Sequence, residues 1–205
     1  MKATFLILFF LVIAFVIKPL PAAADDPEPV LDKDSEQVKA GLDYYILPKD
    51  PKLGGGFTLA SIENTSCPLD VIQERDDALS GYPVRFSTVN SDNGVVYISA
   101  DLNIKFSRVK TACVSSPVWK VDRYNASEGP YFVSVGGVEK NPGPDTVANW
   151  FKIEKFNDDY KLVFCPNVCN SSCNIPCRSF GMYKNNGIRR LALSRRPVKF
   201  IFRRA

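Results

Sequence analysis

The chain has 205 residues, 45% of them hydrophobic, with 26 basic against 22 acidic side chains, a balance that does not suggest a nucleic-acid partner. It contains no histidine, which excludes Ser-His and Cys-His nucleophilic sites and any histidine-bound metal. No pair of acids stands out by its spacing as a hydrolase site, so we expect a protein that is not an enzyme and holds no cofactor or metal.

The first element is a short apolar run near the N-terminus. Lys2 precedes apolar residues from Phe5 to Ile17, and the small residues 22–24 form an A-x-A cleavage signal. This arrangement is typical of a secretory signal peptide. We expect residues 1–24 to be removed, leaving residues 25–205 as a single domain that is secreted to the cell exterior or delivered to a vacuole. The alternative, a retained membrane anchor, needs a longer run of about 20 apolar residues.

Short β-rich runs, separated by Gly, Pro, Asn and Asp, follow this leader. Leu102, Ile104 and Phe106 alternate with Asn103 and Lys105, as in a strand with one buried face. Turn residues at 157–159 and 185–187 are typical of hairpins. Many short strands with regular turns predict an all-β sandwich or barrel. The expected strands are Tyr44–Leu47, Leu69–Gln73, Val84–Phe86, Leu102–Phe106, Tyr131–Val135, Trp150–Phe156, Tyr160–Phe164, Arg189–Leu193 and Val198–Phe202.

The cysteines and the sequons both bear on an extracellular destination. Six cysteines, an even number, are most simply explained as three disulfides in an oxidising compartment. A zinc site is the rival for the last four, whose C-x3-C-x3-C-x3-C spacing is regular. Three N-x-[ST] sequons, at Asn64, Asn125 and Asn170, predict a glycoprotein in which one or two of them are used.

Longer motifs occur along nearly the whole mature chain. They are Val30-Leu31-Asp32, Tyr44-Tyr45-Ile46-Leu47-Pro48, Cys67-Pro68-Leu69-Asp70-Val71, Asn149-Trp150-Phe151-Lys152-Ile153, Tyr160-Lys161-Leu162-Val163-Phe164-Cys165-Pro166 and Arg189-Arg190-Leu191-Ala192-Leu193. Together they resemble the plant Kunitz (soybean trypsin inhibitor) family of protease inhibitors, miraculin-like members included. The resemblance implies a β-trefoil, which has twelve strands in three four-stranded pseudo-repeats.

The resemblance also implies a disulfide pattern. Cys67 is expected to pair with Cys113, and Cys165 with Cys177. Cys169 and Cys173 are extra cysteines inside the second loop, and we expect them to pair with each other. Four cysteines allow three pairings, so the other two arrangements of the last four stay open at this point.

A surface loop shortly after the strand of the first cysteine is the inhibitory element of this family. It presents a bait residue to a serine protease and lies in the cleft like a substrate. The matching stretch is Gly81-Tyr82-Pro83-Val84-Arg85-Phe86. Aligned without gaps on Phe86, the bait falls on Pro83 and the bond to be cut on Pro83–Val84. Trypsin-directed members carry Arg or Lys there, whereas proline has no N–H and no long side chain. A family asparagine that braces the loop is replaced by Ala40.

The resemblance therefore implies a protease inhibitor homologue, of the serine class by family, with an atypical bait loop. Tyr82 and Arg85 are the alternative baits, and a cysteine or aspartic protease could be bound through another loop. The rival hypothesis is a non-inhibitory miraculin-like defence, storage or carbohydrate-binding trefoil, which Pro83 and Ala40 favour.

Association is the last property on which the sequence bears. An even cysteine count leaves no spare thiol for a linked dimer, so we expect a monomer, without a membrane partner. The basic stretch from Arg195-Arg196 to Arg203-Arg204 is interpreted as the solvated face and end of a strand. A heparin-like or membrane-surface patch is the other reading.

Overall fold

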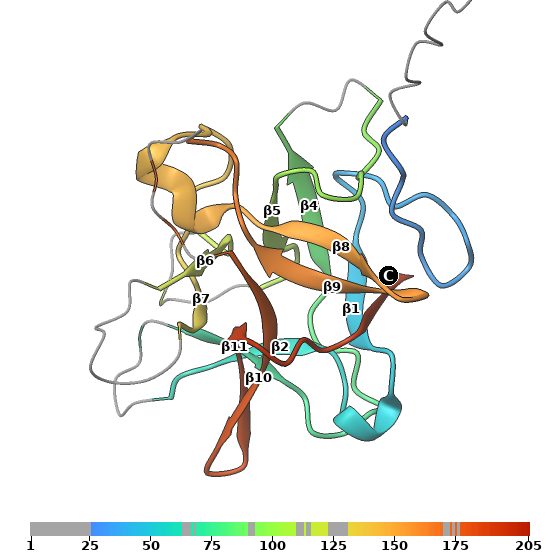
Figure 1. The fold of residues 1–205 in the computed structure, drawn as a ribbon. Helices are drawn as coiled ribbons and strands as arrows, with labels where there is room; N and C mark the ends of the chain where they lie inside the picture. The colour runs from blue at the N-terminus through green and yellow to red at the C-terminus, as the bar shows by residue number, and fades with distance from the viewer. Residues whose placement is uncertain are drawn as a thin grey trace, which may run out of the picture.

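The computed structural model describes residues 26–62, 67, 69–89, 93–109, 113, 116–122, 131–169, 173, 175 and 177–205 (Figure 1). The expected signal peptide and the three sequons lie outside these residues. The helices assigned in the described chain are two short 3-10 turns, η1 (Pro51–Leu53) and η2 (Pro144–Asn149), and neither has the length or apolarity to cross a membrane. The strands are β1 Tyr44–Pro48, β2 Phe57–Ala60, β3 Asp70–Gln73, β4 Val84–Thr88, β5 Leu102–Phe106, β6 Trp119–Val121, β7 Val133–Val135, β8 Lys152–Phe156, β9 Asp159–Phe164, β10 Arg178–Asn185, β11 Ile188–Ser194 and β12 Phe200–Arg204.

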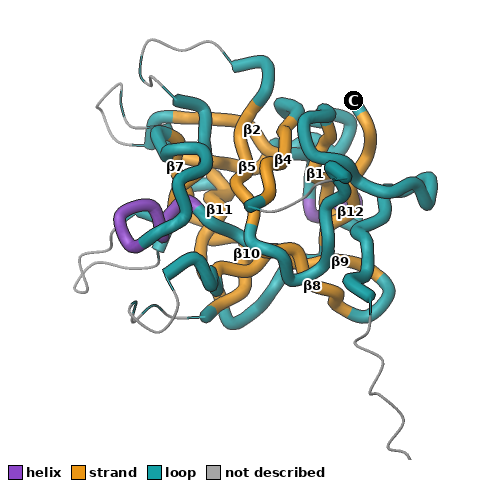
Figure 2. The backbone as a smooth tube through the Cα atoms, turned by 90° about the horizontal axis from the view of Figure 1, so that it is seen from above, coloured by secondary structure: helices purple, strands orange, loops and turns teal. Residues whose placement is uncertain are grey.

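These strands form one sheet that closes on itself. Its main path runs β5-β4-β1-β12-β9-β10-β11-β3-β7-β6, with β2 added to β3 and β8 added to β9. A bridge between Lys105 of β5 and Val118, the residue before β6, joins the two ends of that path. The first and last strands pair antiparallel, from Tyr44 opposite Arg204 to Pro48 opposite Phe200. Seen from above, the strands surround a common centre and the loops lie outside them (Figure 2).

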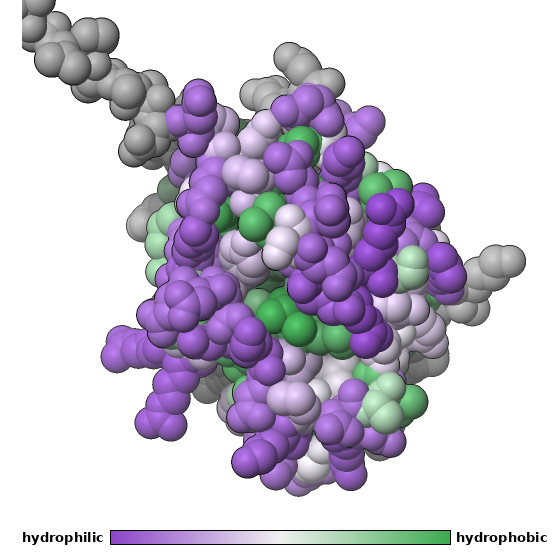
Figure 3. Space-filling model, turned by 90° about the vertical axis from the view of Figure 1, so that its right-hand side faces the viewer, coloured by the Kyte–Doolittle hydropathy of each residue, from purple (hydrophilic) through white to green (hydrophobic). Residues whose placement is uncertain are grey.

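Aromatic side chains fill that centre. The Trp119 ring is fully buried; it meets the Phe57 ring edge-on at a centroid distance of 5.5 Å, and the Phe106 ring lies tilted against it at 5.3 Å. Rings of this size bury a large apolar area each, and their edge-to-face contacts add to its stabilising effect. On the face of the molecule drawn in Figure 3, hydrophilic residues surround small, separate apolar areas. The apolar residues of the strands are thus mainly turned inward.

All nine expected strands are present, with ends that differ by a few residues, and the prediction of an all-β fold is confirmed. The sequence pattern misses β2, β6 and β10. The alternation in β5 predicts a solvent-facing Asn103, but this residue is only 1% exposed. Its amide donates to the carbonyl of Asn149 at 2.8 Å, and its side-chain oxygen accepts from the backbone N–H of Lys140 at 2.7 Å. Because the N–H and the oxygen of the Asn103 amide are both hydrogen-bonded, its burial leaves no polar atom of that side chain unsatisfied. The bond to Lys140 also holds the loop that covers β5.

Three disulfides use all six cysteines. Cys67 and Cys113 are joined across 46 residues, Cys165 and Cys177 across 12, and Cys169 and Cys173 across 4. Their Cα separations are 5.2, 4.4 and 5.9 Å, within the usual range for a disulfide. The first two are the pairs that the family resemblance implies, and the third is the pair expected for the two extra cysteines.

Candidate functional site

The segment that joins β3 to β4 contains the stretch expected to bind a protease, and its first half is an exposed turn. The backbone N–H of Leu79 donates to the carbonyl of Asp76 at 3.2 Å, and the N–H of Ala78 donates to the Asp76 side chain at 2.9 Å. Residues 75–79 are exposed, and Leu79 keeps 49% of its surface in solvent. The tip of this segment is thus a compact turn rather than an extended strand.

A run of three glycines lies directly beneath this turn. The N–H of Gly55 donates to the carbonyl of Glu74 at 3.0 Å, and the N–H of Gly56 donates to that of Leu79 at 2.9 Å. A Cβ on Gly55 would lie 2.0 Å from the Leu79 carbonyl oxygen, and one on Gly56 would lie 2.0 Å from the Ser80 carbonyl oxygen. Because no side chain fits there, the glycines let the turn pack closely onto the chain before β2.

The second half of the segment, which contains the expected bait, is folded into the protein. The N–H of Tyr82 donates to the carbonyl of Phe57 at 2.7 Å, and the carbonyl of Pro83 accepts from the N–H of Ser107 at 2.9 Å. Pro83 is buried, and Val84, the first residue of β4, has 0% exposure. The Pro83–Val84 bond is therefore buried, contrary to the expectation of an exposed reactive bond, because Val84 begins a core strand.

The two alternative baits are also held in place. Tyr82 is 41% exposed, but its ring packs edge-on against Phe106 at a centroid distance of 5.9 Å. Arg85 lies within β4, and its guanidinium donates to the carboxylate of Asp43. Burial disfavours ionisation of Asp43, but hydrogen bonds from Arg85, Ser107 and Arg108 outweigh it and hold the pKa of this carboxyl below its ordinary value. Arg85 would have to leave this ion pair to enter a protease pocket.

Ala40, at the expected bracing position, lies beside β4. Its N–H donates to the carbonyl of Gly94 at 2.7 Å, and the next N–H, of Gly41, donates to the carbonyl of Phe86 at 3.1 Å. The Ala40 side chain lines a surface hollow of about 380 Å³ together with Arg85 and Lys140. A methyl group can donate no hydrogen bond, so the side chain at this position holds neither the turn nor the strand by polar contacts.

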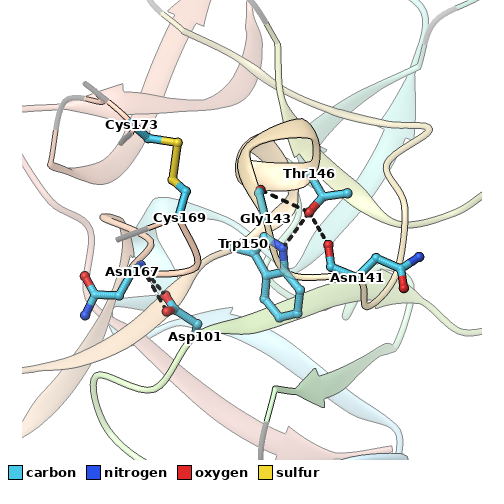
Figure 4. Close-up of a disulfide and its surroundings, with 8 residues drawn as sticks. All are labelled: Asp101, Asn141, Gly143, Thr146, Trp150, Asn167, Cys169 and Cys173. Carbon is cyan, nitrogen blue, oxygen red and sulfur yellow. Dashed lines mark hydrogen bonds between the residues drawn. A yellow bond between two sulfur atoms is a disulfide. The ribbon is translucent and has the colours of Figure 1, made fainter. Parts of the chain in front are cut away.

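A polar contact between Asp101 and Asn167 lies near the small disulfide Cys169–Cys173 (Figure 4). The N–H of Asn167 donates to both oxygens of the Asp101 carboxylate, at 3.2 and 3.0 Å. Burial raises the pKa of Asp101, although the Asn167 N–H and the charge of Lys152 act in the opposite direction. These contacts fix the start of the disulfide loop against the residue that precedes β5.

Residues far from the expected loop in the sequence help to hold it against the rest of the protein, and sequence analysis did not find them. Asp43, Ser107 and the glycines 54–56 all contact the β3–β4 segment or the strand after it. The Gly-Gly-Gly run was the available signal, because three successive glycines indicate a close approach of two backbones. Among the described residues, no group of three or more Cys, Asp or Glu side chains is arranged to hold a metal.

Comparisons with known proteins agree along most of the chain. A family profile described as "Trypsin and protease inhibitor" matches residues 30–204. Miraculin of Synsepalum dulcificum is 44% identical over 198 residues, which cover 93% of this chain and 90% of miraculin. Kunitz trypsin inhibitor 5 of Arabidopsis thaliana is 38% identical over 203 residues, covering 99% of both chains.

A solved structure gives the same result for the fold. A Kunitz-type cysteine protease inhibitor from potato superposes with a TM-score of 0.75 at 36% identity, covering 88% of this chain and 98% of the potato protein. Together with the twelve strands, this likeness confirms the β-trefoil.

Proposed function

Because the chain belongs to the Kunitz family of plant trypsin and protease inhibitors, we propose that it is a secreted, non-catalytic binding protein. In this proposal the stretch from Gly81 to Phe86 is closed, which means that it is held within the protein and cannot bind trypsin as a substrate-like loop would. The proposal corresponds to the miraculin-like, non-inhibitory alternative that Pro83 and Ala40 favour. The observation that carries this proposal is the burial of the Pro83–Val84 bond, since Val84 has 0% exposure.

A substrate-like inhibitor must place several backbone groups of its loop in the protease cleft. Here the N–H of Tyr82 and the carbonyl of Pro83 are already bonded to Phe57 and Ser107 within the protein. Opening the segment would leave these partners unsatisfied, at about 1–3 kcal/mol for each buried group. That penalty would be subtracted from any binding to trypsin.

Inhibition of a serine protease is the second candidate function. Relatives named trypsin inhibitors favour it, and so does the exposed turn around Asp76, which lies just before the buried part of the segment. In that case the turn, with Arg75 and the half-exposed Leu79, would make the contact. The turn carries Asp76 and Asp77 at its tip, however, and trypsin's acidic pocket repels carboxylates.

A protease panel separates the two candidates. The mature, disulfide-bonded protein is titrated against trypsin, chymotrypsin, subtilisin, papain and pepsin, with an established Kunitz inhibitor as positive control. Our proposal predicts no trypsin inhibition at micromolar concentration. Inhibition of papain alone would keep the closed segment and point to another surface, whereas nanomolar inhibition of trypsin would overturn the proposal.

A further inference from the structure

Three exposed arginines gather where β10 begins and β11 ends. Arg178 is the first residue of β10, and Arg195 and Arg196 directly follow β11. Ser179 and Ser194 are the last partners in the antiparallel register of these strands, and Arg178 and Arg195 each adjoin this pair, after which the chain bends at Arg195 and Arg196. Neighbouring strands lie about 4.8 Å apart, so the backbones of Arg178 and Arg195 run close to each other. We call Arg178, Arg195 and Arg196 the arginine cluster.

The backbone beneath the arginine cluster is fixed. The carbonyl oxygen of Arg196 lies 2.5 Å from where a Cβ would be on Gly181, so only a glycine in β10 allows this close approach. The N–H of Arg196 donates to the side-chain oxygen of Ser194 at 3.0 Å, and the N–H of Val198 donates to the carbonyl of Phe180 at 3.2 Å. Arg195 and Arg196 are therefore held on the strand that carries Arg178, not on a loose loop.

The charges of the arginine cluster are uncompensated. Several other cations lie beside acids: Arg108 contacts Asp43, and Lys199 contacts Asp159. In the part of the chain that the structure describes, Arg178, Arg195 and Arg196 form no ion pair. Like charges that lie near each other without acidic partners repel. An anion bound between them would remove that repulsion.

We propose that the arginine cluster binds an acidic polysaccharide through the carboxylate or sulfate groups of successive sugar units. A guanidinium is a planar fork of donors that matches the oxygens of such groups in a bidentate manner, and it stays charged at all relevant pH values. Side chains spread over a strand surface suit a polymer with repeated charges better than a single small anion. A secreted protein meets polysaccharides outside the cell. The proposal rests on the arginine cluster and on the secretion proposed above, and it does not require that the β3–β4 segment be closed.

The test compares two triple variants of the mature protein that lose the same charge. One carries Arg178→Ser, Arg195→Ser and Arg196→Ser. The control carries Lys33→Ser, Arg108→Ser and Lys155→Ser, which removes three exposed cations that each contact an acid. Retention on immobilised heparin and on immobilised polygalacturonate is measured in a sodium chloride gradient. Thermal melts verify that both variants fold.

We expect the wild type and the control to be retained alike, and the arginine-cluster variant to lose at least tenfold in affinity at 50 mM salt. The slope of log affinity against log salt concentration should fall in magnitude by about 2–3 for this variant, because contacts that no longer form release no counterions. An Arg-to-Lys triple variant should bind with intermediate affinity, because it keeps the charge but loses the fork.

Three results would overturn the proposal: equal loss in both triple variants, no retention of the wild type on either column at 50 mM salt, or binding to phosphatidylserine vesicles without binding to either polysaccharide. The protease panel is run in parallel on the arginine-cluster variant. Because the cluster and the β3–β4 segment are separate, failure of the polysaccharide experiment leaves the trypsin result unaffected, and the reverse also holds.

Discussion

Replacement of Pro83 by arginine distinguishes a buried segment from an exposed bait loop. On an exposed loop, Pro83→Arg would supply the basic bait that trypsin prefers and would create an inhibitor. In this structure Pro83 is buried next to Val84, which has 0% exposure, so the same change inserts a long charged side chain beside the core. The substitution should therefore destabilise the protein and leave trypsin uninhibited.

The expected loss of stability follows from two effects. Overpacking of a filled site costs about 1–3 kcal/mol. The guanidinium must also reach solvent past Tyr82, and any of its donors that stay buried without a partner lower the stability further. We therefore expect the free energy of unfolding to fall by about 2–4 kcal/mol in total. For a protein of this size that total corresponds to a fall in Tm of roughly 5–15 °C.

The assay is a thermal melt combined with trypsin titration. The matched control is Ala78→Arg, which adds the same charge to the same segment at an exposed position and should change stability by less than about 0.5 kcal/mol. If Pro83→Arg has the same Tm as Ala78→Arg and inhibits trypsin, Pro83 is exposed in solution and our reasoning about the segment is wrong.

Three further predictions concern stability. Cys113→Ser should lower the free energy of unfolding by about 2–5 kcal/mol, more than replacing both Cys169 and Cys173, because the first disulfide closes 46 residues and the last only 4; denaturant titration measures both, and equal losses would refute the reasoning. Asn103→Leu should cost about 2–4 kcal/mol in the same assay, since two backbone groups lose their buried partner; a neutral result would mean that water replaces the amide. Because the pKa of Asp43 is lowered in the folded protein, its ionised form stabilises the fold at pH values above the ordinary carboxyl pKa, and this stabilisation is lost as pH falls through the lowered pKa. Asp43→Asn should therefore be less stable than the wild type at neutral pH and approach its stability in acid, and parallel stability profiles against pH would contradict this.

Much of the fold could be predicted from local sequence patterns. The strands that alternate clearly, such as Leu102–Phe106, are present where the pattern places them. β10 was missed because Arg178–Asn185 mixes charged residues, a glycine and apolar residues without alternation. It is a strand because β11 pairs with it along seven residues, from Ser179 to Asn185, and that pairing is not visible in its own sequence. Asn103 was assigned to solvent for a similar reason, since the loop that covers it is distant in the chain.

The candidate site was harder to predict than the fold. The pattern Val84-x-Phe86 predicts a strand, and both residues have 0% exposure. A buried strand that begins at Val84 does not leave the Pro83–Val84 bond exposed. The Val84-x-Phe86 pattern therefore already indicated that Pro83 is not an exposed bait residue. An ungapped alignment could not reveal the conflict, because it assumes that the segment has the length and course of its relatives. The glycines beneath the turn and the ion pair between Asp43 and Arg85 required the three-dimensional structure.

The central claim is that the stretch from Gly81 to Phe86 is closed to proteases. Its most direct test is incubation of the mature protein with an equimolar amount of trypsin, followed by residual activity measurement and mass-spectrometric mapping of every cut. Since Tyr82 and Pro83 are bonded to Phe57 and Ser107 and Val84 is buried, our account predicts that trypsin keeps its full activity and that no bond within this stretch is cut. A stable complex with trypsin, or cleavage directly after Arg85, would contradict it.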